Sequence, residues 1–192
     1  MTEDTPAGRT RRSDATRAAI LTAARARFAA DGYERATIRA IAADAGIDPS
    51  MVMRYYGSKD SLFALAARHD LNLGELASVP VDRLGETAVR MFLDRWSGSP
   101  ALPILLRTAG TNAAAADELT RIFREQLAAA IATIAGPDEA VERAGLVASQ
   151  ILGLAICRYV LELEPLATMD GDELAARYGP TLQRYLTSPL PR

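Results

Sequence analysis

Apolar residues recur at steps of three and four along most of the chain, and valine-rich alternating runs are absent from it, so the pattern predicts an all-helical protein. About nine helices are expected, with glycine or proline at the breaks. Residues 1–12 are polar and rich in arginine, and we expect them to form a flexible basic arm. The first helix is predicted to begin at Ser13, to run to about Ala30 and to be ended by Gly32.

Three further helices are predicted to follow closely, and each begins after a residue whose side chain can accept a hydrogen bond from the first turn: Thr37, Asp48 and Ser58. Gly46 and Gly57 are expected to end the first two. The third is predicted to continue to Leu76, with His69 on its inward stripe. Five longer helices are expected beyond Pro80, at residues 82–97, 100–109, 113–135, 138–163 and 171–187.

Residues 37–63 read TIRAIAADAGIDPSMVMRYYGSKDSLF. Two short helices that cross at a glycine have the proportions of a helix-turn-helix, in which the second helix is free to enter a DNA major groove. Its inward positions are predicted to be Val52, Tyr55 and Tyr56. The residues left on its outward side are Pro49, Ser50, Met51, Met53 and Arg54.

This order of residues resembles the N-terminal pattern of the TetR (tetracycline-repressor) family. The elements that carry the resemblance are Thr37, Ile41-Ala42, Ala45-Gly46-Ile47, Tyr55-Tyr56 and Ser58-Lys59-Asp60-Ser61-Leu62. The match covers roughly residues 13–65, whereas residues 66–192 agree only in length and helical character. The resemblance implies an all-α fold with an N-terminal helix-turn-helix DNA-binding domain at residues 13–57 and a helical ligand-binding and dimerisation domain at residues 58–192.

The resemblance also assigns roles to individual positions. It implies that Arg39 reads a base, and a guanidinium suits a guanine edge. Thr37, Tyr55 and Lys59 correspond to phosphate-contacting positions, which orient the protein without reading sequence. The family usually has tyrosine where this chain has Met53, so the operator sequence does not follow from the family.

Specific binding by so short a helix normally requires two copies about one DNA turn apart, so we expect a homodimer on a palindromic operator. The predicted helix at 138–163 is apolar over most of its circumference, and the last helix has one apolar side. The resemblance implies that these two helices form an intersubunit four-helix bundle; alternatively, both serve the core of one chain. The candidate interface residues are Gly145, Ala148, Ser149, Leu152, Gly153, Leu174, Tyr178, Leu182 and Tyr185.

The helices between residues 82 and 135 lie where family members hold a small-molecule effector. Ligand pockets are mostly apolar with a few polar groups, and the residues of this region have that character. The candidates are Met91, Phe92, Trp96, Leu105, Leu106, Thr108, Asn112, Phe123 and Gln126. The same residues would equally suit a filled core.

Composition narrows the remaining classes. One cysteine, Cys157, and one histidine, His69, cannot build a disulfide framework or a cysteine/histidine metal site within one chain. No metal or cofactor is therefore expected. The polar first residues predict no secretory leader. The apolar stretch Ala144–Cys157 is interpreted as a buried helix rather than a membrane span, in a cytoplasmic protein. Charge is weak evidence about nucleic-acid binding: residues 1–60 hold ten basic and eight acidic residues, and the whole chain has a net charge of −2.

Together these patterns predict a one-component transcriptional regulator, most simply a repressor that binds its operator as a dimer and is released by a small, largely apolar ligand. One alternative is a helical ligand sensor or interaction module without specific DNA binding. The other is an enzyme, for which the sequence offers no glycine-rich phosphate loop and no Gly-x-Ser-x-Gly elbow.

Overall fold

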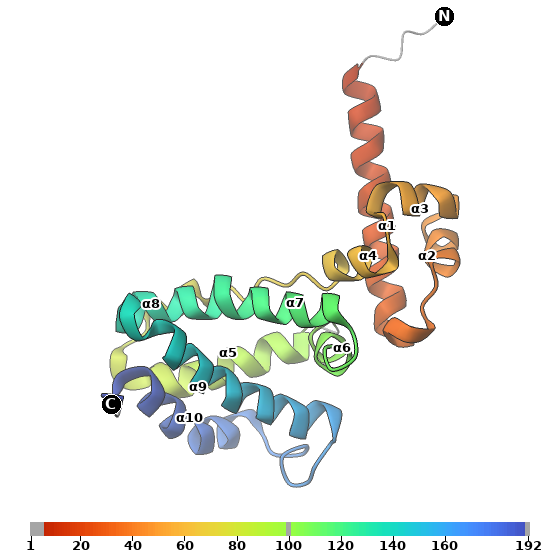
Figure 1. The fold of residues 1–192 in the computed structure, drawn as a ribbon. Coiled ribbons are helices and arrows are strands. Elements are labelled where there is room, and N and C mark those ends of the chain that lie inside the picture. The colour runs from red at the N-terminus through yellow and green to blue at the C-terminus, as the bar shows by residue number, and fades with distance from the viewer. Residues whose placement is uncertain (1–5, 99–100, 191–192) are drawn as a thin grey trace, which may run out of the picture.

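The computed structural model describes residues 6–98 and 101–190, and over them every regular element is helical. A small N-terminal unit, α1 to α4, stands at one end of the molecule (Figure 1), and a larger group of helices, α5 to α10, forms the other end. The predicted fold class is confirmed.

The first helix, α1, spans Pro6–Arg35, and a residue with non-helical dihedral angles, Gly32 (φ 74°, ψ 172°), kinks it near its end. The glycine was predicted as the break, but the predicted start at Ser13 is wrong. Proline is well suited to a first helical turn, and the alanines and arginines that follow it favour helix. Of the expected flexible basic arm, residues 1–5 lie outside the described residues, and residues 6–12 form the first turns of α1 instead.

The next three helices are α2 (Ile38–Ala45), α3 (Pro49–Tyr56) and α4 (Lys59–Ala66), and all three predicted N-caps are confirmed. Thr37 Oγ1 accepts a hydrogen bond from the Ala40 amide at 3.1 Å. Asp48 Oδ1 accepts one from the Ser50 amide at 2.8 Å, and Ser58 Oγ one from the Ser61 amide at 3.0 Å. Because each bond joins residues only two or three positions apart, the starts of the three helices could be predicted from the sequence alone.

The prediction that the helix after Ser58 continues to Leu76 is wrong. α4 ends at Ala66, residues 67–72 have no regular structure, and a 3₁₀-helix spans Leu73–Ser78. His69 and Leu73 therefore do not lie on a helical stripe with Leu62. Side chains from other helices bind the backbone of residues 69–72 and replace the hydrogen bonds that a longer helix would have made.

After a 3₁₀ turn at Val81–Arg83, the C-terminal group consists of α5 (Leu84–Gly98), α6 (Ala101–Thr108), α7 (Ala113–Arg121), α8 (Ala129–Ala135), α9 (Pro137–Ala155) and α10 (Gly171–Thr187). Two π-helical segments interrupt the predicted pattern. One, Ile122–Ala128, joins α7 to α8, and the other, Ile156–Val160, extends α9.

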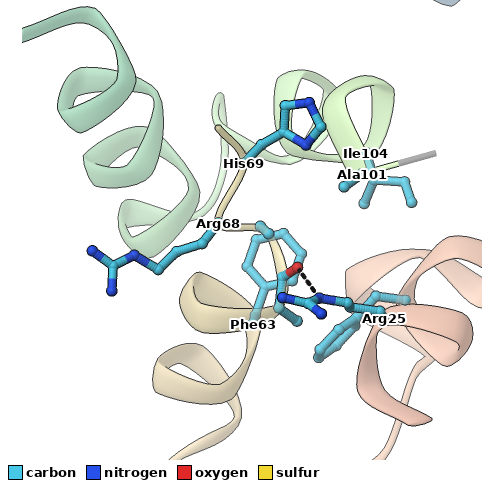
Figure 2. Close-up of a pocket in the computed structure, with 9 residues that line it drawn as sticks. Arg25, Phe63, Arg68, His69, Ala101 and Ile104 are labelled. Carbon is cyan, nitrogen blue, oxygen red and sulfur yellow. Dashed lines mark hydrogen bonds between the residues drawn. The ribbon is translucent and has the colours of Figure 1, made fainter. Parts of the chain in front are cut away.

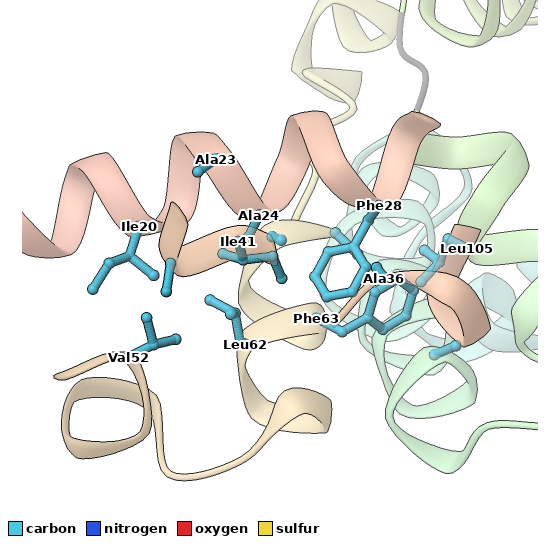
Figure 3. Close-up of a cluster of buried hydrophobic side chains, with 14 of the residues drawn as sticks. Ile20, Ala23, Ala24, Phe28, Ala36, Ile41, Val52, Leu62, Phe63 and Leu105 are labelled. Atoms are coloured by element: carbon cyan, nitrogen blue, oxygen red, sulfur yellow. The ribbon is translucent and has the colours of Figure 1, made fainter. Parts of the chain in front are cut away.

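The core of the N-terminal unit continues into the C-terminal group. Its buried cluster contains Phe28 of α1 and Phe63 of α4, whose rings meet edge to face with centroids 5.0 Å apart. Leu105 of α6 and Ile122 of the π-helical segment belong to the same cluster, and Figure 3 shows Leu105 close to the two phenylalanines. The two ends of the molecule therefore share apolar packing.

A second cluster holds α5, α8, α9 and α10 together. Helices α5 and α10 approach so closely that a Cβ added to Gly85 would lie 2.1 Å from the Gly179 carbonyl oxygen. Arg143 of α9 is 5% exposed and donates hydrogen bonds to the carbonyl oxygens of Tyr185 and Ser188 at the end of α10. These bonds satisfy terminal carbonyls that would otherwise lose their partners.

The continuous helix Pro137–Val160 is long and apolar enough to cross a membrane by length and composition alone, although its apolar stretch was expected to be too short. Its most apolar window is only 33% buried within the chain. The buried, hydrogen-bonded Arg143 and the packing against α8 and α10 mark it as a core helix with one open face.

Candidate DNA-binding surface and ligand cavity

The three side chains of helix α3 that were predicted to face inward all belong to, or pack against, the buried N-terminal cluster, and they also join α3 to α1. Val52 is fully buried, the Tyr56 hydroxyl donates a hydrogen bond to the Arg17 carbonyl oxygen at 2.8 Å, and the Arg17 guanidinium lies 5.4 Å from the centroid of the Tyr55 ring. These contacts fix the rotation of α3 about its axis. The opposite side of α3 is consequently directed outward.

The outward side of α3 is chemically mixed. Ser50, Met53 and Arg54 are exposed, and Met53 retains 43% of its accessible surface. Pro49 and Met51 are half-buried. The Ser50 hydroxyl donates to Asp48 Oδ1, and this bond, with the bond from the Ser50 amide, holds the pKa of the Asp48 carboxyl below its usual range. Asp48 therefore remains ionised beside the start of the helix.

The three predicted DNA-contacting residues outside α3 differ in whether their side chains already have partners within the chain. Arg39 of α2 is exposed and has no ion pair or hydrogen bond with any described residue. Thr37 is exposed, but its hydroxyl oxygen already caps α2. Lys59 lies with Nζ 4.3 Å from the centroid of the Tyr33 ring and donates to the Glu34 carbonyl oxygen at 3.3 Å. A DNA phosphate would have to compete with those contacts or share the ammonium group.

A cavity of about 140 Å³ lies within the C-terminal group between α5, the π-helical segment Ile122–Ala128 and α9. Its lining is apolar apart from the side chains of Arg95 and Trp96. The Arg95 guanidinium is already engaged, because it donates to the carbonyl oxygens of Leu71, Met91 and Asn72. The buried Trp96 Nε1 has no hydrogen-bond partner among the described residues. The cavity is therefore suited to an uncharged, largely apolar occupant.

Only three of the nine candidate ligand residues line this cavity: Phe92, Trp96 and Phe123. Met91 and Leu105 are buried in the two core clusters, and Leu106 and Thr108 lie elsewhere on α6. Asn112 and Gln126 bind other parts of the chain. The lining residues that sequence reasoning did not identify are Leu71, Leu73, Leu76, Ala88, Arg95, Leu102, Leu119, Ile122, Leu127, Ile131, Val147, Ala148, Ile151, Leu152 and Leu186. Nothing in their spacing separates a cavity wall from a filled core.

Figure 2 shows a second hollow, of about 300 Å³, at the junction between α1, α4 and α6. Phe63 and Ile104 form part of its apolar wall. Arg25 Nε donates to the Ala66 carbonyl oxygen at 3.2 Å, while the Arg68 side chain extends away from Arg25. The two guanidinium groups therefore do not converge on a common point where an anion could bind.

The candidate interface residues fall into two groups. On α9, Gly145, Ser149 and Gly153 are exposed, while Ala148 and Leu152 are half-buried. On α10, Leu174 and Leu182 are fully buried within the same chain, and Tyr178 and Tyr185 pack partly against that core. Two further apolar residues on the open side of the same continuous helix were missed by sequence reasoning: Val141, 65% exposed, and Ile156, 38% exposed.

The helix-turn-helix with a separate helical group defines a class, that of one-chain DNA-binding transcription regulators. Two family models match the chain: "Bacterial regulatory proteins, tetR family" over residues 20–66, and "Tetracyclin repressor-like, C-terminal domain" over residues 82–186. A TetR-family regulator from Streptomyces coelicolor A3 is 36% identical, with 90% of this chain and 95% of that chain covered and a TM-score of 0.67. The chain therefore belongs to the TetR family of bacterial transcriptional regulators.

Two more distant solved structures share the fold. A transcriptional regulator from Rhodococcus sp. Rha1 is 21% identical, with 88% of this chain and 95% of that chain covered and a TM-score of 0.61. GusR from Salmonella enterica is 19% identical, with 89% and 93% covered and a TM-score of 0.61. The comparison with curated proteins found no match.

Proposed function

We propose that this regulator is a repressor that binds a palindromic DNA operator as a homodimer and leaves it when a small apolar ligand occupies the cavity in the C-terminal group. The observation that carries the DNA-binding part is the orientation of α3. Its inward residues lock it to α1, and its outward side presents Ser50, Met53 and Arg54. The Arg39 guanidinium of α2, which has no partner among the described residues, adds a donor for a base edge or a phosphate.

The dimeric part of the proposal is supported by the open side of α9. Val141, Gly145, Ser149, Gly153 and Ile156 are all exposed and recur at steps of three and four, which places them along one side of the helix. Small residues in this stripe permit a close approach of a second helix. On α10 the contacts would have to come from beside Tyr178 and Tyr185, because Leu174 and Leu182 face the chain's own core.

The ligand is proposed to be small and uncharged. An apolar cavity of about 150 Å³ engineered in another protein binds benzene, and the present cavity is similar in size at about 140 Å³. A larger effector would require the helices around the cavity to move apart, which is one way in which binding could alter the molecule. No catalytic step is proposed, and a cytoplasmic location follows from the proposed contact with chromosomal DNA.

Selection of duplexes from a random pool by the full chain tests the DNA-binding part. The expected product is a two-fold symmetric sequence with half-sites about one helical turn apart, bound by two chains, with affinity that falls as salt rises. Enrichment of no sequence over random duplex would instead support the alternative, a helical ligand sensor without specific DNA binding. Sedimentation of the selected complex counts the bound chains.

A further inference from the structure

The segment that leads from the N-terminal unit into the C-terminal group, residues 67–72, is held by side chains from two other helices. Gln126 Oε1 accepts a hydrogen bond from the Leu71 amide at 2.7 Å, and Gln126 Nε2 donates to the His69 carbonyl oxygen at 2.8 Å. Arg95 of α5 donates to the carbonyl oxygens of Leu71 and Asn72. We call residues 67–72 the linker; it follows α4 in Figure 2, where His69 lies beside the helices of the C-terminal group.

Gln126 lies in the π-helical segment Ile122–Ala128, which also forms part of the cavity wall through Ile122, Phe123 and Leu127. A π-helical turn contains more residues than an α-helical turn, and short π segments within longer helices are frequent at functional sites. Conversion of this segment to regular α-helix would rotate the residues on one side of it relative to the other. A regular α-helix over the same residues would be the second arrangement on which a switch could depend.

The same segment contributes to the buried cluster beneath the DNA-binding unit. Ile122 is 7% exposed and belongs to the buried cluster that includes Phe28 and Phe63, although it also lines the cavity. Leu71 of the linker likewise packs against that cluster and lines the cavity. One short stretch of chain thus contacts the cavity, the linker and the core beneath the helix-turn-helix.

We propose that Gln126 couples the cavity to the DNA-binding unit: an occupant of the cavity displaces the π-helical segment, Gln126 releases the backbone of His69 and Leu71, and α4 is freed to shift with the helix-turn-helix. The inference rests on the proposed function, since it specifies how ligand binding reaches the DNA. An occupant weakens DNA binding to the extent that it binds the arrangement without the two Gln126 hydrogen bonds more tightly than the arrangement with them.

The chain contains a matched control for the two hydrogen bonds that Gln126 makes to the linker. Gln183 of α10 also binds the backbone at two points, since its Oε1 accepts from the Gly85 amide at 2.8 Å and its Nε2 donates to the Val81 carbonyl oxygen at 2.6 Å. It joins α10 to the start of α5, and none of its side-chain hydrogen bonds with the described residues reaches the linker. Gln183→Met therefore removes equivalent bonds without interrupting the proposed coupling.

A substitution can serve as the occupant, because Ala88 of α5 lines the cavity. Operator affinity is measured for the full chain, on the duplex selected as above, with and without Ala88→Phe in the native, Gln126→Met and Gln183→Met backgrounds. We expect Ala88→Phe to weaken binding at least about fivefold in the native and Gln183→Met backgrounds, the lower end of ordinary allosteric coupling, and less than about twofold with Gln126→Met. Circular dichroism establishes that each variant is folded, and Ala88→Leu replaces any Ala88→Phe variant that is not.

Equal weakening in all three backgrounds, or no weakening in the native chain, overturns the inference while leaving the proposed function intact. Amide hydrogen exchange provides a readout that needs no DNA: Ala88→Phe should accelerate exchange of the Leu71 amide in the native chain, and Gln126→Met alone should accelerate it as much. Unchanged exchange at Leu71 in the Ala88→Phe chain also overturns the inference. If selection enriches no duplex, the proposed function fails, and the exchange result alone decides whether cavity and linker are coupled.

Discussion

The Asn112 side-chain amide donates a hydrogen bond from Nδ2 to Asp60 Oδ1 at 3.0 Å, and so joins the start of α7 to the first turn of α4. The Tyr33 hydroxyl donates to the same carboxylate oxygen. These two donors, the tyrosine first, hold the pKa of the Asp60 carboxyl below its usual range. The Asp60 carboxylate thus interacts favourably with the dipole at the start of α4. It also links the two ends of the molecule through its bond with Asn112.

Asn112→Ala should lower the free energy of unfolding by about 1–2 kcal/mol, because Asn112 Oδ1 also caps α7 by accepting from the Ala115 amide at 3.0 Å. Urea denaturation measures the change. Asn112→Ser preserves a capping hydroxyl and removes only the longer amide that reaches Asp60, so it should cost less. Equal losses for the two variants would show that the cap contributes nothing.

Two glycines should respond in opposite ways to a side chain. Gly85→Ala places a methyl group against the backbone of α10, 2.1 Å from the Gly179 carbonyl oxygen, and should destabilise the chain by at least about 1–3 kcal/mol. At Gly153 a Cβ would meet nothing within 4 Å in the same chain. Gly153→Arg should therefore leave the fold intact and dissociate the proposed dimer, as judged by sedimentation equilibrium.

Gly98→Arg is the control for the added charge, since Gly98 is exposed on α5 and a Cβ added there would meet none of the described residues within 4 Å. It should change neither the fold nor the dimer. A Gly153→Arg chain that remains dimeric at low concentration would exclude the open side of α9 as the interface.

Arg39→Ala should weaken binding to the selected operator by roughly 1–3 kcal/mol and relax the preference at one base pair of each half-site. Arg39 is exposed and its guanidinium is unpartnered among the described residues, so its removal should not affect folding. Arg83→Ala, an exposed arginine in the turn before α5, provides the control. Competition binding against single-base operator variants separates base reading from phosphate contact. Equal losses for every variant would reassign Arg39 to the phosphates.

His69 should make stability depend on pH below neutrality. Burial lowers the pKa of its imidazole from the ordinary value of 6.5, nearby Asp70 opposes that effect, and Arg95 adds to it. The unfolded chain therefore takes up a proton near pH 6.5 while the folded chain does not, so stability is fully present above that pH and falls as the pH decreases toward the lower folded pKa. Urea midpoints between pH 7.5 and about 5.5 should decline in the native chain and decline less in His69→Gln. Parallel curves for the two chains would refute the assignment.

Much of the N-terminal unit was predictable because its determinants are local. Thr37, Asp48 and Ser58 each cap the helix that follows through a bond to an amide two or three residues away, so neighbouring residues suffice to place α2, α3 and the start of α4. The final helix, expected at residues 171–187, was found at Gly171–Thr187, where the Asp170 side chain caps it at 2.7 Å. The outward residues of α3 follow from the same local geometry.

The rest depended on contacts between residues distant in the chain. α4 stops at Ala66 because Gln126, 57 residues beyond His69, binds the backbone that a longer helix would have used. An apolar stripe indicates that a side of a helix is buried but carries no information about what covers it, so Leu182 could be assigned to a dimer interface although it faces α10's own chain. The cavity exists because side chains from several helices leave part of the space between them unfilled. The sequence of any one helix does not reveal such a gap.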